Sequence, residues 1–321
     1  MVAQLAALGI AYQENVPMSS KTSFKIGGAA ELMLFPASPG QLSDCIRLCL
    51  EHSEATEPRR RRPFILGNGS NLLVKDSGLD GVVISTEKLQ RLKYMGDGRI
   101  YCEAGVKLSE LCIFAQKNGL SGLEFAYGIP GSAGGAAYMN AGAYGGEMKD
   151  VLLYVSVVQP DGSPIVYFAP EHKNYSITQL DGSTIVHTAP ELKLGYRRSV
   201  FMETGDVVSV ITLQLAPGDP AAIRAKMDEI MQKRRDKQPL EYPSAGSVFK
   251  RPEGHFAGAL IEQCGLKGHS VGGAQVSEKH AGFIVNTGDA KARDVRALIA
   301  LVQAVVEAET GVFLEPEIRF V

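Results

Sequence analysis

The sequence lacks the signatures of membrane and secreted proteins. Its 321 residues contain no run near the roughly 18 apolar residues that a membrane-spanning helix needs. Residues 1–5 lack the charged segment that opens a secretory signal peptide, and no long apolar core follows them. We therefore expect a cytoplasmic protein that does not insert into a membrane.

The small net charge and the spacing of the cysteines argue against nucleic-acid binding and against a metal site. A formal net charge of −2 argues against nucleic acid as the main partner. The one basic run, 59–62, follows the acidic stretch 51–57 and is predicted to be a solvated loop. The five cysteines form no Cys-x-x-Cys pair, so we predict reduced thiols and no metal site. Cys45 and Cys49 lie one helical turn apart, which leaves a zinc half-site open, although buried thiols on an amphipathic helix explain the spacing better.

The two common nucleotide-binding fingerprints are missing as well. No Gly-x-x-x-x-Gly-Lys-Ser/Thr segment is present, and the glycine-rich stretch 67–74 is followed by a β-like run, not by a helix. It follows the apolar run 64–66, so the pattern predicts a strand, a glycine-rich turn and a strand. A loop of this kind can bind a phosphate through backbone amides.

A longer glycine-rich stretch, 126–146, contains seven glycines. Neither a helix nor a strand favours this composition, since glycine loses the most backbone entropy on ordering. We therefore predict an ordered loop whose amides bind a pyrophosphate, with Ser132 and Asn140 adding polar contacts. The alternative is a mobile surface loop, but such a loop would carry more charge and fewer apolar residues such as Ile129 and Met139. Two glycine loops suit a long, diphosphate-bridged cofactor.

Hydrophobic periodicity and capping residues predict the remaining elements. Residues 1–18 read as a short helix and a linker. Helices are expected from Pro39, from a cap at Ser109, from Pro220 after Asp219, near 257–264 and through Glu309; strands are expected at 31–35, 100–103, 151–158, 207–215, 281–286 and 313–320. Residues 159–171 and 179–191 agree at nine of thirteen positions, and each contains Asp-Gly between β-formers. This repeat predicts a tandem hairpin, peripheral to the core.

Both glycine stretches and much of the C-terminal part resemble one family. The resemblance rests on residues 22–28 (TSFKIGG), 67–73 (GNGSNLL), 128–132 (GIPGS), 140–145 (NAGAYG), 195–197 (GYR), 242–250 (YPSAGSVFK), 266–268 (LKG), 272–280 (GGAQVSEKH) and 314–317 (LEPE). In this order the motifs are similar to those of the UDP-N-acetylenolpyruvoylglucosamine reductases, flavoenzymes of peptidoglycan synthesis. The approach from Tyr242 to Ser247 resembles their shorter subclass, which lacks an extra tyrosine-bearing loop, whereas the tandem hairpin is longer than the resemblance implies.

The resemblance implies an α+β fold with a two-lobed FAD-binding domain of the vanillyl-alcohol-oxidase (PCMH) type and a C-terminal α+β substrate domain. We place lobe 1 at 1–79, lobe 2 at 80–216 with the hairpin insert near 159–191, and the substrate domain at 217–321. The implied reaction reduces UDP-N-acetyl-3-O-(1-carboxyvinyl)-glucosamine, a UDP-sugar, to UDP-N-acetylmuramate with NADPH. Neither glycine loop contains histidine or cysteine, so FAD is expected to bind noncovalently. The cofactor-binding residues assigned in this way are Gly67, Asn68, Gly69, Ser70, Asn71, Leu72, Gly131, Ser132, Gly134, Gly135, Asn140 and Gly142.

The chemistry of the implied reaction assigns the catalytic residues. Hydride addition to the enolpyruvyl group creates an enolate, and the guanidinium of Arg197 suits its carboxylate. The neighbouring Arg198 is instead expected to make a surface ion pair. Ser247 is the expected proton donor, although a serine in this turn could also make only local hydrogen bonds.

By its matched position Glu317, protonated or bridged by water, is the expected support for the enolate, with Glu315 as the competing choice. The resemblance also assigns four residues to the substrate: Tyr242, Lys250, Lys279 and His280. Two other functions remain open. A sugar or alcohol oxidase of the same fold would need no UDP site, and a flavin-binding sensor or storage module would not turn over NADPH.

Overall fold

The computed structural model describes residues 1–52, 62–169, 177–178, 184–185 and 191–321. The chain divides into two compact units, and neither is continuous in sequence. The first unit contains residues 1–11, 34–67 and 84–230, and the second contains 12–33, 68–83 and 231–321. The second unit therefore combines the C-terminal part with two short segments from the N-terminal third.

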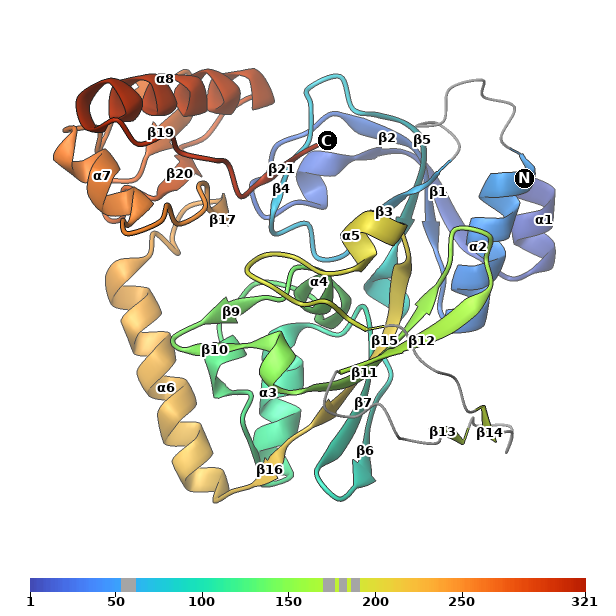
Figure 1. Cartoon of the computed structure of the whole chain (residues 1–321). Coiled ribbons are helices and arrows are strands. Elements are labelled where there is room, and N and C mark those ends of the chain that lie inside the picture. Colours follow the sequence, from blue (N-terminus) through green and yellow to red (C-terminus); the bar gives the residue numbers. More distant parts are fainter. Residues whose placement is uncertain (53–61, 170–176, 179–183, 186–190) are drawn as a thin grey trace. The chain divides into compact units, whose positions relative to one another are not determined.

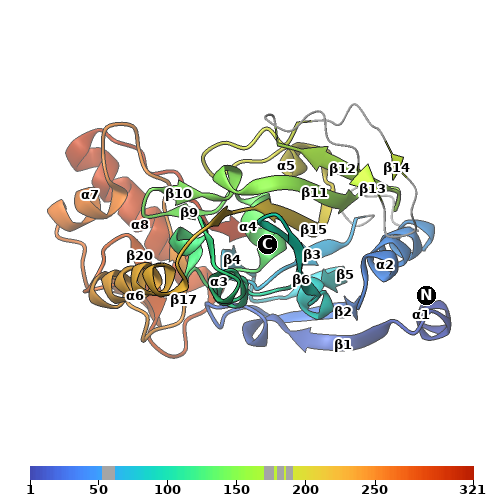
Figure 2. The same ribbon diagram turned by 90° about the horizontal axis from the view of Figure 1, so that it is seen from below.

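The first unit is built on a five-stranded sheet of order β12-β11-β15-β7-β6. Figure 2 shows β12, β11 and β15 side by side. Helix α4 packs against β15 and β7. The elements within this unit are α1 (Val2–Ala7), α2 (Pro39–Glu51), β3 (Phe64–Leu66), β6 (Leu92–Gly96), β7 (Arg99–Glu103), α3 (Leu108–Lys117), β8 (Leu120–Ser121), α4 (Ala133–Tyr138), β9 (Gly142–Ala143), β10 (Gly146–Glu147), β11 (Leu152–Val158), β12 (Pro164–Phe168), β13 (Ile177–Thr178), β14 (Thr184–Ile185), α5 (Phe201–Thr204), β15 (Val207–Gln214) and β16 (Ala216–Pro217).

The second unit is built on a four-stranded sheet of order β17-β20-β19-β18. Helix α8 packs against β18, β19 and α7, and its predicted apolar face is buried. The C-terminal strand β21 lies beside β4 in a parallel pair (Figure 1). The elements within this unit are β4 (Leu72–Leu73), β17 (Ser244–Ser247), α7 (Ala257–Gln263), β18 (Ser270–Val271), β19 (Ala274–Val276), β20 (Phe283–Asn286), α8 (Ala292–Thr310) and β21 (Arg319–Phe320).

Strands β1 (Ala11–Pro17), β2 (Ala29–Phe35), β5 (Leu79–Ser85) and β3 form a sheet in the order β1-β2-β5-β3. Helix α6 (Pro220–Lys237) precedes the C-terminal part of the chain. As predicted, Asp219 caps α6, since its carboxylate accepts hydrogen bonds from the backbone N–H groups of Ala221 and Ala222. The mixture of helices and strands confirms the predicted α+β class.

Helix α2 explains the paired cysteines. Leu42, Cys45, Ile46 and Cys49 are all buried, as the helical spacing predicted. Burial raises the pKa of the Cys45 and Cys49 thiols to about 12, so both remain protonated at neutral pH. The spacing therefore reflects packing of the helix.

Four local predictions were wrong. The supposed linker after α1 contains strand β1, and the supposed strand 313–320 is limited to β21 and an isolated bridge between Phe249 and Pro316. Ser109 does not cap α3, because that helix begins at Leu108 after Lys107. The glycine-rich stretch 126–146 is not a continuous loop, because it contains α4. In this helix, small residues permit close packing: a Cβ on Gly134 would lie 2.6 Å from Cβ of Ala104.

The repeat at 159–191 also differs from the prediction. Its first copy forms a hairpin, because β11 and β12 pair on either side of Asp161 and Gly162. This hairpin is not peripheral: β12 belongs to the main sheet, and Tyr167 and Phe168 on it are buried. In the second copy, β14 pairs antiparallel with β13, which lies just before the copy, and residues 179–183 and 186–190 lie outside the described residues.

Candidate active site

The two glycine loops meet in the first unit. A Cβ placed on Gly67 would lie only 2.7 Å from Oγ of Ser132, so the end of one loop adjoins the start of α4 in the other. A side chain at position 67 would fill the space between them. This glycine-lined junction fits the requirement of a diphosphate, which needs close approach of backbone and few side chains.

The rest of the first glycine loop belongs to the second unit. Gly69 has a φ of 61°, and a Cβ there would lie 2.2 Å from the carbonyl oxygen of Lys21. Within the described part of the chain, the amide N–H groups of Gly69 and Ser70 donate no hydrogen bond. Both groups are therefore available to an anionic ligand, and their binding to the cofactor diphosphate remains a prediction.

Ser23 fixes this loop, a role that the sequence interpretation missed. Its Oγ donates a hydrogen bond of 2.6 Å to the carbonyl oxygen of Ser244, just before Ser247, and its N–H donates one to Gly69. The segment TSFKIGG thus connects the glycine loop to the strand that carries the predicted proton donor. Its resemblance to a family motif was the only signal in the sequence.

In the second glycine stretch, several amides are already used within the protein. The N–H groups of Ala133 and Gly134 donate to carbonyl oxygens of Val106 and Ala104, and that of Gly135 donates to Oγ of Ser132 over 3.3 Å. Gly134 and Gly135 are therefore explained by the close packing and capping of α4. Their assignment to the cofactor remains a prediction, as does that of Gly131.

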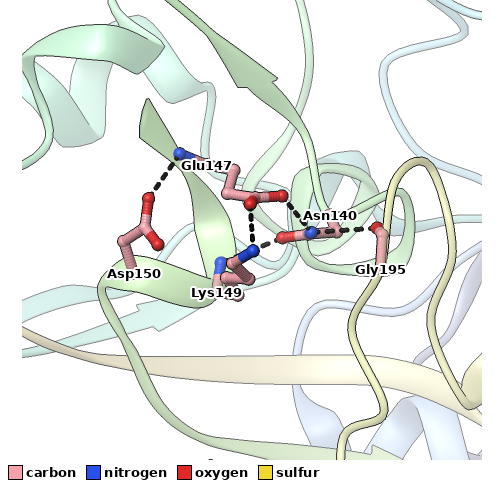
Figure 3. Close-up of polar contacts among 5 residues, drawn as sticks. All are labelled: Asn140, Glu147, Lys149, Asp150 and Gly195. Atoms are coloured by element: carbon pink, nitrogen blue, oxygen red, sulfur yellow. Dashed lines mark hydrogen bonds and ion pairs between the residues drawn. The ribbon is translucent and has the colours of Figure 1, made fainter. Parts of the chain in front are cut away.

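Asn140 is at the centre of a buried hydrogen-bond network (Figure 3). Its Nδ2 donates to Oε2 of Glu147 over 2.6 Å and to the carbonyl oxygen of Gly195 over 3.0 Å. Its Oδ1 accepts a hydrogen bond of 2.9 Å from the N–H of Lys149. Glu147 also pairs with the ammonium of Lys149, and this hydrogen bond is the main cause of a raised Lys149 pKa. The side-chain amide of Asn140 thus connects three segments of the first unit.

Arg197 lies in a tight turn held by this network. The N–H and C=O groups of Gly195 and Arg198 bond to each other in both directions, at 3.0 and 3.1 Å. Arg197 itself has a φ of 54°, a conformation that costs energy for a residue with a side chain and often marks a functional site. Its Nη1 lies 3.4 Å from the carbonyl oxygen of Gly142, and Arg198 pairs with Glu203, as expected for the surface arginine.

Ser247 and Glu317 lie on adjacent segments of the second unit. The N–H of Glu317 donates a hydrogen bond of 2.7 Å to the carbonyl oxygen of Val248, the residue after Ser247. A register shift in β17, with Gly246 at a φ of 78°, turns the chain just before Ser247. Both side chains are half-buried, and Oγ of Ser247 donates over 3.3 Å to the carbonyl oxygen of Phe249.

Glu315 and Glu317, the two candidate acids, differ in their exposure and in their hydrogen-bond partners. Glu315 is exposed, and its carboxylate pairs with the ammonium of Lys250 over 2.5 Å. The backbone of Glu317 instead accepts a hydrogen bond from Nδ2 of Asn71, in the glycine loop. Arg319 and Val321 extend this contact by donating their N–H groups to Asn71 and Leu73, so the segment of Glu317 runs beside residues 71–73. Leu72 lies in β4 of the same pair.

The remaining predicted substrate residues have different environments. Lys279 donates to the carbonyl oxygen of Arg235 at the end of α6, where a cation is favourable for the helix. Tyr242 is exposed. Burial is the main cause of a lowered His280 pKa, and Nδ1 of the ring accepts the N–H of Gly282. The neutral ring therefore carries its proton on Nε2.

His280 also lies close to Ser247. A Cβ on Gly282 would lie 3.0 Å from Cε1 of His280 and 3.6 Å from Oγ of Ser247. The second unit thus brings together Ser247, Glu317, His280 and the loop residues Gly69–Asn71, while Arg197, Asn140, Gly142 and Ser132 belong to the first unit. The roles of all these residues, including Asn68, remain predictions.

The described residues lack two kinds of feature. No helix among them is long and apolar enough to cross a membrane. Nor do they contain a group of three or more histidine, cysteine, aspartate or glutamate residues placed to hold a metal ion.

Comparison with known proteins gives consistent matches over both parts of the chain. Residues 30–166 match a family described as FAD binding domain, and residues 238–321 match one described as UDP-N-acetylenolpyruvoylglucosamine reductase, C-terminal domain. The sequence is 46% identical to the UDP-N-acetylenolpyruvoylglucosamine reductase of Syntrophomonas wolfei over 308 residues, covering 96% of this chain and 94% of that protein. It is 43% identical to the enzyme of that name from Clostridium novyi, covering 96% and 92%.

A solved structure agrees with the sequence matches. The crystal structure of UDP-N-acetylenolpyruvylglucosamine reductase from Thermus caldophilus aligns with a TM-score of 0.75 at 34% identity, covering 97% of this chain and 98% of that one. The matches confirm an FAD-binding domain followed by a separate C-terminal domain. On the identity and coverage of these relatives, the chain belongs to the UDP-N-acetylenolpyruvoylglucosamine reductase family.

Proposed function

We propose that the chain reduces UDP-N-acetyl-3-O-(1-carboxyvinyl)-glucosamine to UDP-N-acetylmuramate, with FAD as cofactor and NADPH as electron donor. The observation that carries the proposal is the adjacency of Ser247 and Glu317. The residue after Ser247 and the segment of Glu317 are joined by a backbone hydrogen bond, from the N–H of Glu317 to the carbonyl oxygen of Val248, and Asn71 of the glycine loop donates to the carbonyl oxygen of Glu317. A sensor or storage module would need the loop but not this pair.

In this proposal the glycine loops hold the diphosphate of FAD, through the amides of Gly69 and Ser70 and around the junction of Gly67 and Ser132. Bound there, FAD would supply the hydride chemistry that links NADPH to C3 of the enolpyruvyl group. Residues 1–79 and 80–216 form the two lobes of the FAD domain, and 217–321 bind the substrate. FAD is held noncovalently.

The three catalytic residues act on the charge that hydride addition creates. Negative charge develops at C2 and, by resonance, on the adjacent carboxylate. Arg197 offers this carboxylate two parallel N–H donors, which stabilise the enolate. Ser247 then gives its proton to C2 and is reprotonated from solvent, and Glu317 supports the developing charge as a protonated acid or through a bridging water. The hydroxyl of Ser247 must turn from the carbonyl of Phe249 toward the substrate for this step.

Other side chains suit the UDP part of the substrate. Lys250 offers a positive charge near the diphosphate, although it must exchange Glu315 for that partner. His280 can donate a hydrogen bond from Nε2 to the substrate, and the exposed ring of Tyr242 can cover an apolar face of it. Lys279 is the weakest of these assignments, because its ammonium bonds to the end of α6. Because nucleotide sugars and NADPH are cytoplasmic, we expect the reaction in the cytoplasm and no nucleic-acid partner.

The visible spectrum of the purified protein tests the proposal. Under anaerobic conditions NADPH should bleach the flavin absorbance, and the enolpyruvyl sugar nucleotide should restore it. Oxidation by air alone, with no response to the sugar nucleotide, would identify an oxidase of the same fold. A flavin that NADPH does not reduce would point to a storage or sensor protein.

A further inference from the structure

We propose that Asn140 is a positioning residue for Arg197: its buried amide fixes the turn 195–198, and with it the guanidinium that meets the substrate carboxylate. This inference rests on the proposed function and concerns a residue that the sequence assigned to the cofactor. It follows from three features of the first unit: the saturation of the Asn140 side chain, the strained turn of Arg197, and the contacts that join them.

The first feature is that the Asn140 side chain has little capacity left for a cofactor. Its two amide hydrogens go to Glu147 and Gly195, and its oxygen accepts from Lys149. The orientation of the amide is fixed by these partners, because a backbone N–H can only donate and a carbonyl oxygen can only accept. The residue is also almost fully buried, so loss of any of these bonds leaves an unsatisfied polar group.

The second feature is strain at both ends of the contact. Asn140 has a φ of 42° and Arg197 a φ of 54°, both in the left-handed region. Asparagine tolerates this region better than most residues, whereas arginine does not. Arg197 keeps its conformation only if its surroundings enforce it.

The third feature is that the turn is held on both sides by the same stretch of chain. Asn140 bonds to the carbonyl of Gly195 at the start of the turn, and Oγ of Ser199 donates over 2.6 Å to the carbonyl of Tyr138 just after it. Arg197 in turn reaches the carbonyl of Gly142. The Asn140 side chain, oriented by Glu147, therefore sets the position from which Arg197 extends.

Two substitutions distinguish the contribution of the Asn140 side-chain amide from that of its left-handed backbone conformation. Asn140→Asp keeps the shape but replaces both donors with a carboxylate that faces Glu147 and the Gly195 carbonyl. Asn140→Gly keeps the left-handed backbone and removes the amide. Asn118→Asp is the matched control, since Asn118 is exposed and its amide only bonds to Phe114 in its own helix.

Kinetics of the two half-reactions are the first readout. Both Asn140 variants should retain flavin and be reduced by NADPH at the wild-type rate. Reoxidation by the enolpyruvyl sugar nucleotide should slow on the order of 10²-fold, the cost of a misplaced catalytic group. In an Arg197→Ala background, Asn140→Asp should cause no further loss, because the residue acts only through Arg197. Multiplying losses in the double variant would overturn the proposal, and so would loss of flavin with intact turn geometry.

Hydrogen exchange of the peptide 194–199 is the second readout, and it needs no substrate. The amides of Gly195 and Arg198 should exchange faster in both Asn140 variants than in the Asn118→Asp control. Unchanged exchange would contradict the positioning role. If the wild-type enzyme failed to use the enolpyruvyl substrate, the proposed function would fall while this comparison still tested the role of Asn140.

Discussion

A serine hydroxyl is a weak acid, so Ser247 can act as the proton donor only toward a strong base such as the new carbanion at C2. Reduction of flavin by NADPH involves no such carbanion. The two half-reactions should therefore respond differently to loss of this hydroxyl, even though both use the same flavin.

Ser247→Ala should leave reduction by NADPH close to wild type and slow reoxidation by substrate by roughly 10²–10⁴-fold, typical of a lost general acid. Stopped-flow absorbance measures each step. Ser270→Ala is a suitable control, because Ser270 is exposed and its Oγ only bonds to Gly268. Equal slowing of both half-reactions in Ser247→Ala would make Ser247 a positioning residue for the flavin.

For single residues, sequence patterns identified candidate catalytic groups but could not choose between them. Glu315 and Glu317 share one face of a β-like run and look equivalent in the sequence. The contact between Glu315 and Lys250 brings together residues 65 positions apart, as does the still longer link between Asn71 and Glu317. Such pairs depend on the tertiary fold, so no local pattern reveals them. Glu147 had one local signal, the Glu-x-x-Asp capping box with Asp150.

At the scale of elements, the close approach of the two glycine loops leads to a prediction about cofactor binding. Gly67→Ala should lower FAD occupancy of the purified protein, because the new Cβ would lie 2.7 Å from Oγ of Ser132 and fill the space between the loops. Gly40→Ala, whose Cβ would lie 3.8 Å from Oγ of Ser38, should retain full occupancy. The ratio of flavin to protein absorbance measures both, and equal occupancy would contradict the assignment.

A buried hydrogen bond on strand β12 leads to a prediction about the stability of the protein. Its Tyr167 donates a hydrogen bond of 2.5 Å to the buried carboxylate of Asp206, and burial is the main cause of a Tyr167 pKa raised to about 12. Tyr167→Phe leaves that carboxylate without this partner and should cost about 1–3 kcal/mol of unfolding free energy. The half-buried Tyr154 on β11 provides the control Tyr154→Phe. Thermal unfolding should show a lower Tm for Tyr167→Phe than for Tyr154→Phe and the wild type; a Tyr167→Phe Tm equal to the wild-type value would contradict a stabilising role of the bond to Asp206.

Elements with strong periodicity were predictable, and those set by close packing were not. The apolar faces of α2 and α8 and the Asp219 cap of α6 follow from local sequence. Helix α4 was missed because its glycines oppose helix formation in isolation. Only packing of Gly134 against Ala104, together with the Ser132 cap, makes a helix favourable there.

At the scale of the whole molecule, the assembly of the second unit from three segments could not be read from the sequence. Residues 12–33 and 68–83 cluster with 231–321, so each compact unit combines segments that are distant in the sequence. The contacts of Ser23 with Gly69 and Ser244 show why: one short segment holds both the first glycine loop and the strand of the predicted proton donor. Such a segment gives no compositional signal of its own.

The stoichiometry of a single anaerobic turnover tests the central claim most directly. Enzyme reduced with one equivalent of NADPH per flavin is mixed with the enolpyruvyl sugar nucleotide, and products are identified by mass spectrometry. We predict one UDP-N-acetylmuramate per flavin, which carries two more hydrogens than the substrate, and full return of oxidised flavin absorbance. Reoxidation without this product, or unchanged sugar nucleotide beside reduced flavin, would contradict the assignment of this chain as an enolpyruvyl reductase.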